Sequence, residues 1–390
     1  MTSSKTMRYE GIDFGRLQMR STIKGIAAEK KGFIITVVML VVFGIVITMS
    51  ASISVKIHNG VDITTKILVN VLVSIVMMGL VMWKVPIEKW KKQGVIYPVV
   101  GFVLVLLLLP IILNIRINGA YRWISLGFFS LQPAELAKIV VVAFLAYIFS
   151  TMRHPRPTMD ELLPIGVVTG LIVLFIFMER DLGLPLVIAV TVLAMLFVTR
   201  TNRLVVVALM VLGLMLFAGA VMTAQHRRNR VIQFWDRKTG VNTLSFDKIP
   251  DDQIGAALLA VSSAGLKGKG LGNSETKFSS LTEAHNDFVF SLIIEELGLS
   301  GFIIVAILFT LFMVFGLRMA YTAQGRFEHF FLIGMVFLTI SQAVLHMMVN
   351  VDMLPAKGFG LPFISYGGSS MVSHMMMVGL AMTVKLKGEE

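Results

Sequence analysis

The sequence of 390 residues contains no cysteine, so it excludes disulfide and thiol chemistry and gives no information about the redox compartment. Charged residues are also scarce, at 15% of the chain, whereas soluble domains average about a quarter. Hydrophobic residues make up 56% of the sequence, and the mean hydropathy is +0.82. Long apolar runs recur along the whole chain. The composition therefore predicts an all-α, polytopic integral membrane protein without a large soluble domain.

Ten apolar segments have about the length that a helix needs to cross a bilayer, roughly 20 residues. They lie at residues 33–54, 66–83, 95–115, 133–151, 162–178, 183–199, 204–224, 286–316, 328–349 and 370–385. We expect residues 33–385 to form a ten-helix membrane domain, between an N-terminal tail at residues 1–32 and a C-terminal tail at residues 386–390. The first apolar run starts near Phe33 and is too long for a signal-peptide core, so no cleavable signal peptide is expected.

Lysine and arginine are distributed unevenly between the two sides of these spans. Of the 35 basic residues, 19 lie in the N-terminal tail, in the loops after spans 2, 4, 6 and 8, and at the C-terminal end. Because basic loops face the cytoplasm, we predict that both termini are cytoplasmic. The net charge of +12 then reflects this bias and contact with anionic lipids. Nucleic acid is not an expected partner, because the basic residues are spread over short loops.

The longest loop, at about residues 225–285, falls on the outer side in this topology. It is basic as well, with a cluster at residues 226–230 that includes Arg230. Long loops do not follow the positive-inside rule, so the predicted orientation stands. The cluster has two interpretations: a solvated loop that pairs with lipid phosphates, or a site that captures the anionic headgroup of a substrate.

Asp287 lies on this outer side, between a polar run at residues 283–286 and the apolar run that begins with Phe288. Ionisable groups at the membrane boundary are costly and usually functional. The alternative is that Asp287 caps the following helix. Glu295 and Glu296 lie deeper in the same span, where one of them could pair with Lys138.

Three further groups of polar residues fall on the same outer side. One comprises Arg122 and the pair Glu135 and Lys138, which are three residues apart and so share a helix face. That pair either braces two helices or contacts a substrate. Another is the charged hairpin at residues 179–183, where a structural ion network and a substrate contact are both open. The glycine-rich stretch at residues 262–273 belongs to the same loop as Asp287, and it permits either close approach to a ligand or a flexible connection.

The last of these groups, at residues 350–370, contains polar residues within a mainly apolar segment. The segment is rich in glycine and proline, so it cannot continue as a helix. Non-helical backbone at membrane depth is tolerated only where protein or a cavity covers it. We therefore predict a re-entrant segment that lines a cavity, with Lys357 and Ser365 within it. Ser369 or Ser370 is expected to cap the final span.

At these stretches the chain resembles the SEDS family, which comprises the FtsW, RodA and SpoVE polymerases of bacterial cell-wall synthesis. The matching segments are NGAYRWISLG, LQPAELAK, AGLKGKGLGNS, EAHNDFVFSLIIEELG and LPAKGFGLPFISYGGSS. The catalytic aspartate of the family lies in an H-T-D-F motif, which residues 285–288 match at Asp287 with Asn in place of Thr. The segment around Lys357 resembles the division (FtsW) branch more than the elongation branch.

The resemblance implies a glycosyltransferase that polymerises lipid II at the outer face of the bacterial cytoplasmic membrane, with Asp287 as general base. The expected substrate-binding residues are Arg122, Glu135, Lys138, Arg230, His285, Lys357, Ser365 and Ser369. A class B penicillin-binding protein, other division or elongation proteins and membrane lipids are the expected partners. No cofactor is certain, although Mg²⁺ or Mn²⁺ could stabilise the departing diphosphate. A lipid-precursor flippase and a non-catalytic scaffold for a transpeptidase remain as alternatives.

Overall fold

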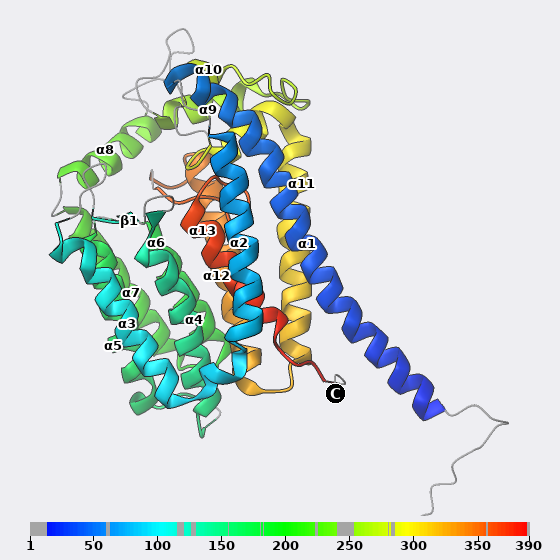
Figure 1. Cartoon of the computed structure of the whole chain (residues 1–390). Coiled ribbons are helices and arrows are strands. Elements are labelled where there is room, and N and C mark those ends of the chain that lie inside the picture. Colours follow the sequence, from blue (N-terminus) through cyan, green and yellow to red (C-terminus); the bar gives the residue numbers. More distant parts are fainter. Residues whose placement is uncertain are drawn as a thin grey trace, which may run out of the picture.

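The computed structural model describes residues 14–59, 63–114, 121–125, 130–154, 156–179, 181, 183–222, 225–239, 253–279, 281, 285–355 and 358–387. Helices dominate this part of the chain, as Figure 1 shows. The short strands β1 (Ile124–Ser125) and β2 (Ser130–Leu131) form an antiparallel pair. The predicted all-α class is therefore confirmed.

Each of the ten predicted spans coincides with one long helix. Seven of these helices are long and apolar enough to cross a membrane in the described residues: α1 (Phe14–Asn59), α2 (Thr64–Lys84), α3 (Gln93–Ile112), α4 (Pro133–Thr151), α5 (Met159–Met178), α11 (Val289–Thr322) and α12 (Arg326–Asn350). The other three predicted spans lie on α6 (Gly183–Val198), α7 (Arg203–Met222) and α13 (Gly368–Met382). The chain is thus a multi-pass membrane protein, while the count of ten spans stays a prediction.

Two segments that were predicted as a tail and a loop contain helices in the structure. Helix α1 already begins at Phe14 and runs for 46 residues, so the predicted tail is helical over residues 14–32. The predicted outer loop at residues 225–285 contains three helices: α8 (Gln225–Thr239), α9 (Gln253–Ser263) and α10 (Thr276–Ser279). Hydropathy missed α8 because that helix is polar and basic, and an apolar window detects only spans.

The apolar helices differ in how much of their surface the protein covers. In the most apolar window of α4, 83% of the residues are buried, and the corresponding value for α12 is 61%. The values for α2, α3 and α5 are only 17%, 28% and 22%. Helices α4 and α12 pack against each other and form the centre of the bundle, whereas the other three expose apolar side chains as a lipid-facing surface would.

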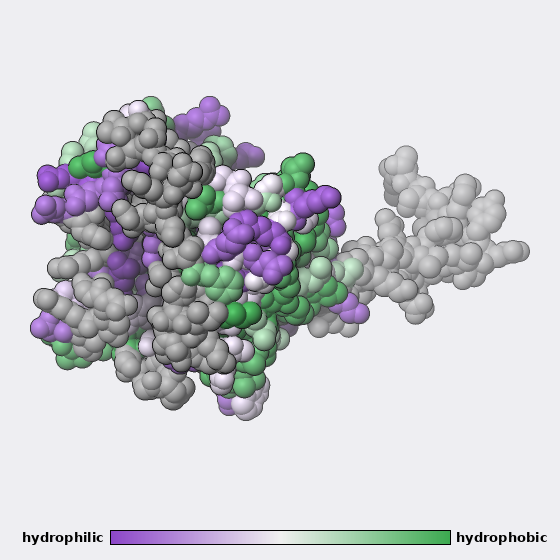
Figure 2. Space-filling model, turned by 90° about the horizontal axis from the view of Figure 1, so that it is seen from above, coloured by the Kyte–Doolittle hydropathy of each residue, from purple (hydrophilic) through white to green (hydrophobic). Residues whose placement is uncertain are grey.

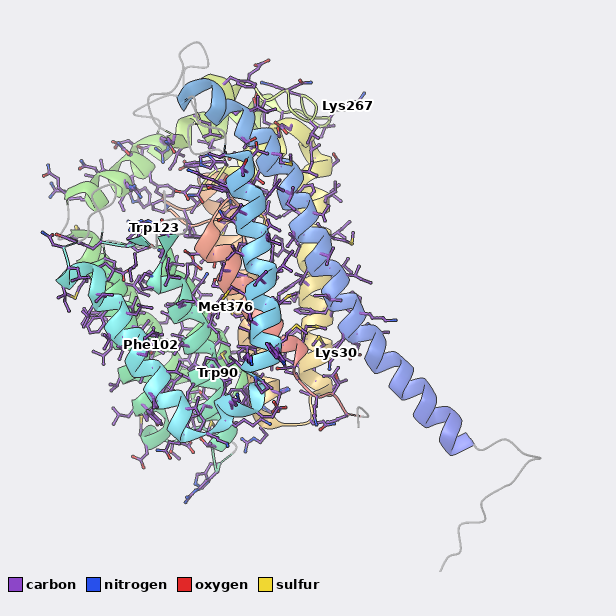
Figure 3. The ribbon with its side chains drawn as sticks, in the orientation of Figure 1. Lys30, Trp90, Phe102, Trp123, Lys267 and Met376 are labelled. Atoms are coloured by element: carbon purple, nitrogen blue, oxygen red, sulfur yellow. The ribbon has the colours of Figure 1, made fainter. Side chains whose placement is uncertain are left out.

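The two sides of the bundle carry different parts of the chain. The start of α1 and the end of the described chain lie on one side, and α8, α9 and α10 lie on the other (Figure 1). Trp90 and Lys30 lie toward the first side, and Trp123 and Lys267 toward the second (Figure 3). Tryptophan is typical of the two membrane–water interfaces. The short helix η1 (Ile87–Lys91), which contains Trp90, connects α2 to α3.

The glycine-rich stretch before α10 docks on α11 rather than on an open ligand site. The amides of Lys269 and Gly270 donate to the carbonyls of Glu295 and Glu296 at 2.8 and 2.9 Å. Helix α11 is kinked there, because Gly298 has a φ of +62°. A Cβ atom on Gly268 would lie 2.4 Å from the carbonyl oxygen of Glu296. The close approach predicted from these glycines is therefore made to another backbone.

Candidate functional site

Glu135 and Lys138 on α4 form the ion pair that their spacing predicted. The Nζ atom of Lys138 lies 2.6 Å from Glu135 Oε2 and donates to Gln342 Oε1 on α12 at 2.7 Å. Ser373 on α13 donates to the same Glu135 oxygen at 3.0 Å. Because Lys138 is fully buried, its bonds to Glu135 and Gln342 compensate for the loss of water. The pair therefore joins α4, α12 and α13 in the core of the bundle.

Helix α12 carries three polar side chains at a spacing of four residues, which sequence reasoning missed. Gln342 Nε2 donates to the Gly360 carbonyl at 3.0 Å, and His346 Nδ1 lies 2.9 Å from the Phe359 carbonyl. Asn350 Nδ2 donates to the Asp287 carbonyl at 3.0 Å. The three residues form one stripe on α12 that holds the segment after α12 and the turn before α11. The i, i+4, i+8 spacing of polar residues in an apolar span was the signal that could have revealed them.

Asp287 lies in a turn at residues 285–288, immediately before α11. The N-cap residue of α11 is Phe288, and no side chain from its own segment caps the helix. Instead, Asn350 Oδ1 on α12 accepts from the Ser291 amide at 3.1 Å. Asp287 therefore does not act as the cap that was its alternative role. Its side chain is half-buried, and a Cβ atom on Gly358 would lie 3.1 Å from Asp287 Oδ2.

The segment after α12 packs inside the bundle, as its apolar residues predicted. Phe359, Leu361, Phe363 and Ile364 are all buried. Ser365 Oγ donates to the Asn286 carbonyl at 2.8 Å and accepts from the Leu361 amide at 2.7 Å, while the Tyr366 amide donates to the His285 carbonyl at 2.9 Å. These bonds bring the segment against the turn that contains Asp287. A small pocket beside it is lined by Thr48, Asn70 and Tyr366, between α1 and α2.

Neither Ser369 nor Ser370 caps α13, although one of the two was predicted to do so. The N-cap residue is Gly367, without a side-chain cap, because Ser369 already lies in the first turn of the helix. Its hydroxyl donates to the Ser130 carbonyl at 2.6 Å and accepts from the Gln132 amide at 3.0 Å. Ser369 thus attaches α13 to β2 and to the start of α4.

Two acidic residues of the 179–183 hairpin have different environments. Asp181 Oδ1 accepts from the Gly183 amide at 2.8 Å and so caps α6. Glu179 is fully buried, and neither of its carboxylate oxygens has a hydrogen-bond partner among the described residues. Burial raises the pKa of Glu179 to about 9, with a further rise from Asp181 and an opposing effect of Arg122. Arg122 also donates from Nε to the Glu179 carbonyl at 3.4 Å.

Arg230 on α8 faces the same region. Burial and the charge of Arg122 lower the pKa of Arg230, whereas the carboxylates of Asp287 and Asp181 raise it. Arg230 therefore lies within electrostatic reach of each of these three charges. Burial also lowers the pKa of His285, so this imidazole is neutral at pH 7. Arg230 thus interacts electrostatically with Arg122, Asp181 and Asp287, whereas Lys357 and Arg180 lie outside the described residues.

Glu295 and Glu296 do not pair with Lys138. Glu295 accepts from Ser274 Oγ at 2.5 Å, from Lys269 Nζ at 3.1 Å and from Thr276 Oγ1. Glu296 pairs with Lys277 at 2.7 Å and accepts from Ser50 at 2.6 Å, and all three side chains are buried. Both glutamates fasten the 264–279 segment to α11 and α1. The suggested pairing with Lys138 is wrong, because Lys269 and Lys277 lie next to the two glutamates in the folded chain.

The described residues contain no group of three or more His, Asp or Glu side chains that could hold a metal ion. The positive charges that act on this region come from Arg122 and Arg230, which suit an anionic substrate. The described residues therefore do not form an all-protein cage for a resident Mg²⁺ or Mn²⁺ ion. Seen from above in Figure 2, hydrophilic residues gather on the face that bears α8, and apolar residues cover the adjoining flank.

Comparisons with known proteins match nearly the whole chain. The family model described as "Cell cycle protein", for FtsW, RodA and SpoVE, matches residues 31–390. A probable peptidoglycan glycosyltransferase FtsW from Geobacter metallireducens is 32% identical over 95% of this chain and 99% of its own length. The protein of the same name from Marinomonas mediterranea is 31% identical over 92% of this chain and 89% of its own.

Two solved structures share the fold. One belongs to a structure described as "Structural coordination of polymerization and crosslinking by a peptidoglycan synthase complex". It has a TM-score of 0.72 and 24% identity, over 90% of this chain and 96% of that one. The other is the rod shape determining protein RodA of Thermus thermophilus, with a TM-score of 0.63 and 24% identity, over 90% and 95% of the two chains.

Proposed function

Because the chain belongs to the FtsW/RodA/SpoVE family, we propose that it is a peptidoglycan glycosyltransferase that polymerises lipid II into glycan strands. The relatives named FtsW favour a role in cell division. The observation that carries the proposal is the position of Asp287. The side chain of Asn350 bonds to the main-chain carbonyl of Asp287 and so holds this turn. The Asp287 carboxylate lies within electrostatic reach of the cationic side chain of Arg230.

Asp287 acts in this proposal as the general base that removes the proton from the acceptor sugar hydroxyl. A base needs a fixed position and access to its substrate. The turn at residues 285–288 supplies both properties, because its backbone is bonded to α12 and to the segment after it, while the Asp287 side chain is only half-buried.

The diphosphate of lipid II requires positive charge where it leaves the donor sugar. Arg122 and Arg230 supply that charge at the outer end of the bundle, and Lys138 lies deeper, held by Glu135. Lys357 is a further proposed ligand.

Three uncharged side chains complete the proposed substrate contacts. His285 contributes a neutral imidazole from the same turn as Asp287. Ser365 and Ser369 each donate one hydrogen bond and accept another inside the protein. A hydroxyl has two acceptor lone pairs, so each serine retains one with which to accept a bond from a sugar hydroxyl.

The proposed orientation places α8 and Asp287 outside the bacterial cytoplasmic membrane, with both termini in the cytoplasm. The excess of lysine and arginine at the opposite end supports it. Single cysteines introduced at positions 5, 240 and 388 test it, since the chain has no cysteine of its own. A membrane-impermeant maleimide should label only position 240 in intact cells. Labelling at 5 or 388 would contradict the orientation.

Polymerisation of purified lipid II tests the activity itself. We expect the purified protein, alone or with a class B penicillin-binding protein as its proposed partner, to form glycan strands that a gel resolves by length. The flippase alternative predicts movement of lipid II across vesicles without polymer. The scaffold alternative predicts that polymer forms neither alone nor in the complex unless another polymerase is added. Absence of polymer from both preparations would refute the proposal.

A further inference from the structure

Helix α8 has two faces with different environments. Arg230 and Arg237 are seven residues apart, so they project from the same face, about 20° from each other around the helix axis. Arg237 forms an ion pair with Asp352, with 2.9 Å between Nη2 and Oδ1, and only 8% and 3% of the two side chains are exposed. Arg228, nine residues before Arg237, projects from the opposite face and is exposed.

Asp352 belongs to the turn that ends α12. Its φ of +52° places it in the left-handed region, which a non-glycine residue adopts only when its surroundings hold it there. Its amide donates to the Val349 carbonyl at 3.1 Å. Asn350, two residues earlier, holds the Asp287 carbonyl at 3.0 Å. The end of α12 and the turn that follows it therefore contact both the segment that carries Asp287 and the helix that carries Arg230.

We infer that Arg237 and Asp352 form a positioning pair that seats α8 across the site, so that Arg230 faces Asp287 at a fixed separation. The inference rests on the proposed function, in which Asp287 is the base and Arg230 binds the diphosphate. Arg237 and Asp352 do not touch the substrate in this account. They act through Arg230, two turns earlier on the same face of α8.

The geometry explains why a pair of this kind can control the reaction. Asn350 fixes the backbone of Asp287, and Asp352 fixes α8 through a buried ion pair. The turn that carries Asp287 and the helix that carries Arg230 are therefore both attached to the C-terminal end of α12. Removing one member of a buried pair leaves an uncompensated charge and releases the helix. A displacement of about 1 Å at a catalytic group can reduce a rate by roughly 100-fold.

The test measures kcat and KM for lipid II polymerisation in Arg237→Met and Asp352→Asn. We expect each to lower kcat/KM by about 10- to 100-fold. Arg237→Lys keeps the charge and should recover part of that loss. Arg228→Met removes the same charge from the exposed face of the same helix, so it should stay within about twofold of the wild type if α8 acts through position rather than through total charge.

The decisive readout is a double-variant comparison with Arg230→Met. If Arg237 acts only through Arg230, then Arg237→Met should cause no further loss in the Arg230→Met background, although it is harmful alone. A multiplicative further loss would overturn the inference. So would full activity of both Arg237→Met and Asp352→Asn.

Folding and the proposed function are controlled separately. Melting temperatures in detergent identify variants that fail to fold, and Asp352→Asn preserves the shape of the side chain in case Arg237→Met does not fold. If the wild type makes no polymer, or Asp287→Asn is fully active, then the proposed function fails. If the wild type is active, Asp287→Asn is inactive and both pair variants remain active, then only the positioning pair is refuted.

Discussion

Two acidic residues near the start of α11 are eight positions apart and have opposite environments. The carboxylate of Glu295 is fully buried and accepts bonds from three side chains of the 264–279 segment. Asp287 is half-buried, and its main chain rather than its carboxylate receives the bond from α12. A carboxylate enclosed by donors fastens two segments, whereas one fixed by its backbone can still meet a substrate.

Glu135 challenges this distinction most strongly, because its carboxylate is enclosed and yet is proposed to serve the substrate through Lys138. Either Glu135→Gln or Lys138→Met alone should destabilise the protein by about 3–5 kcal/mol, since each leaves a buried charge without its partner. The double variant should regain most of that stability. We expect it to remain inactive, because Lys138 is a proposed cation of the site.

Melting in detergent and polymerisation assays on the same preparations separate the two roles. A double variant that is both stable and active would assign Glu135 and Lys138 to bracing alone. Glu135 would then resemble Glu295, as an enclosed carboxylate with a structural role only.

Glu179 is a third case, buried without a hydrogen-bond partner among the described residues. Its pKa is raised to about 9, so the folded protein keeps a proton that the unfolded chain loses above its ordinary value of 4.5. Stability is therefore lost as pH rises from 4.5 toward 9. At pH 7, about 2.5 pH units above 4.5, the cost is about 3 kcal/mol at 1.36 kcal/mol for each pH unit.

Glu179→Gln should consequently stabilise the protein by up to about 3 kcal/mol at pH 7, because glutamine is neutral throughout. Melting temperatures of the two proteins should diverge between pH 6 and pH 8.5. A constant difference over that range would show that Glu179 does not titrate as described.

Gly358 tests how closely the segment after α12 approaches the base. A Cβ atom there would lie 3.1 Å from Asp287 Oδ2, so Gly358→Ala must displace one of the two by a few tenths of an ångström. We expect polymerisation to fall by about threefold to tenfold with little change in melting temperature. Gly79→Ala on α2 is the matched control, because a Cβ atom there meets nothing within 4 Å. Equal activities for the two variants would place Asp287 out of contact with that segment.

Local features of the sequence predicted much of this arrangement. Pro133 begins α4, and the three-residue spacing of Glu135 and Lys138 gave their ion pair, because both depend on one helix alone. The partners of Glu295 and Glu296 were not predictable in that way. Lys269 and Lys277 reach them only after the 264–279 segment folds back on the kink at Gly298.

The contacts that support the candidate site were not predicted for the same reason. Asn350 holds Asp287 across 63 positions of sequence, and Asp352 meets Arg237 across 115. Neither contact follows from periodicity, since each depends on how α8, α11 and α12 pack. The helix α8 itself was overlooked because it is basic rather than apolar.

The most direct test compares Asp287→Asn with Glu295→Gln in lipid II polymerisation and in thermal melting. We predict that Asp287→Asn retains the wild-type melting temperature and loses activity by about 10²- to 10⁴-fold, the usual effect of removing a general base. Glu295→Gln should lower the melting temperature, while the molecules that remain folded polymerise at nearly the wild-type rate. An active Asp287→Asn, or a Glu295→Gln protein that is fully stable and inactive, would contradict the account.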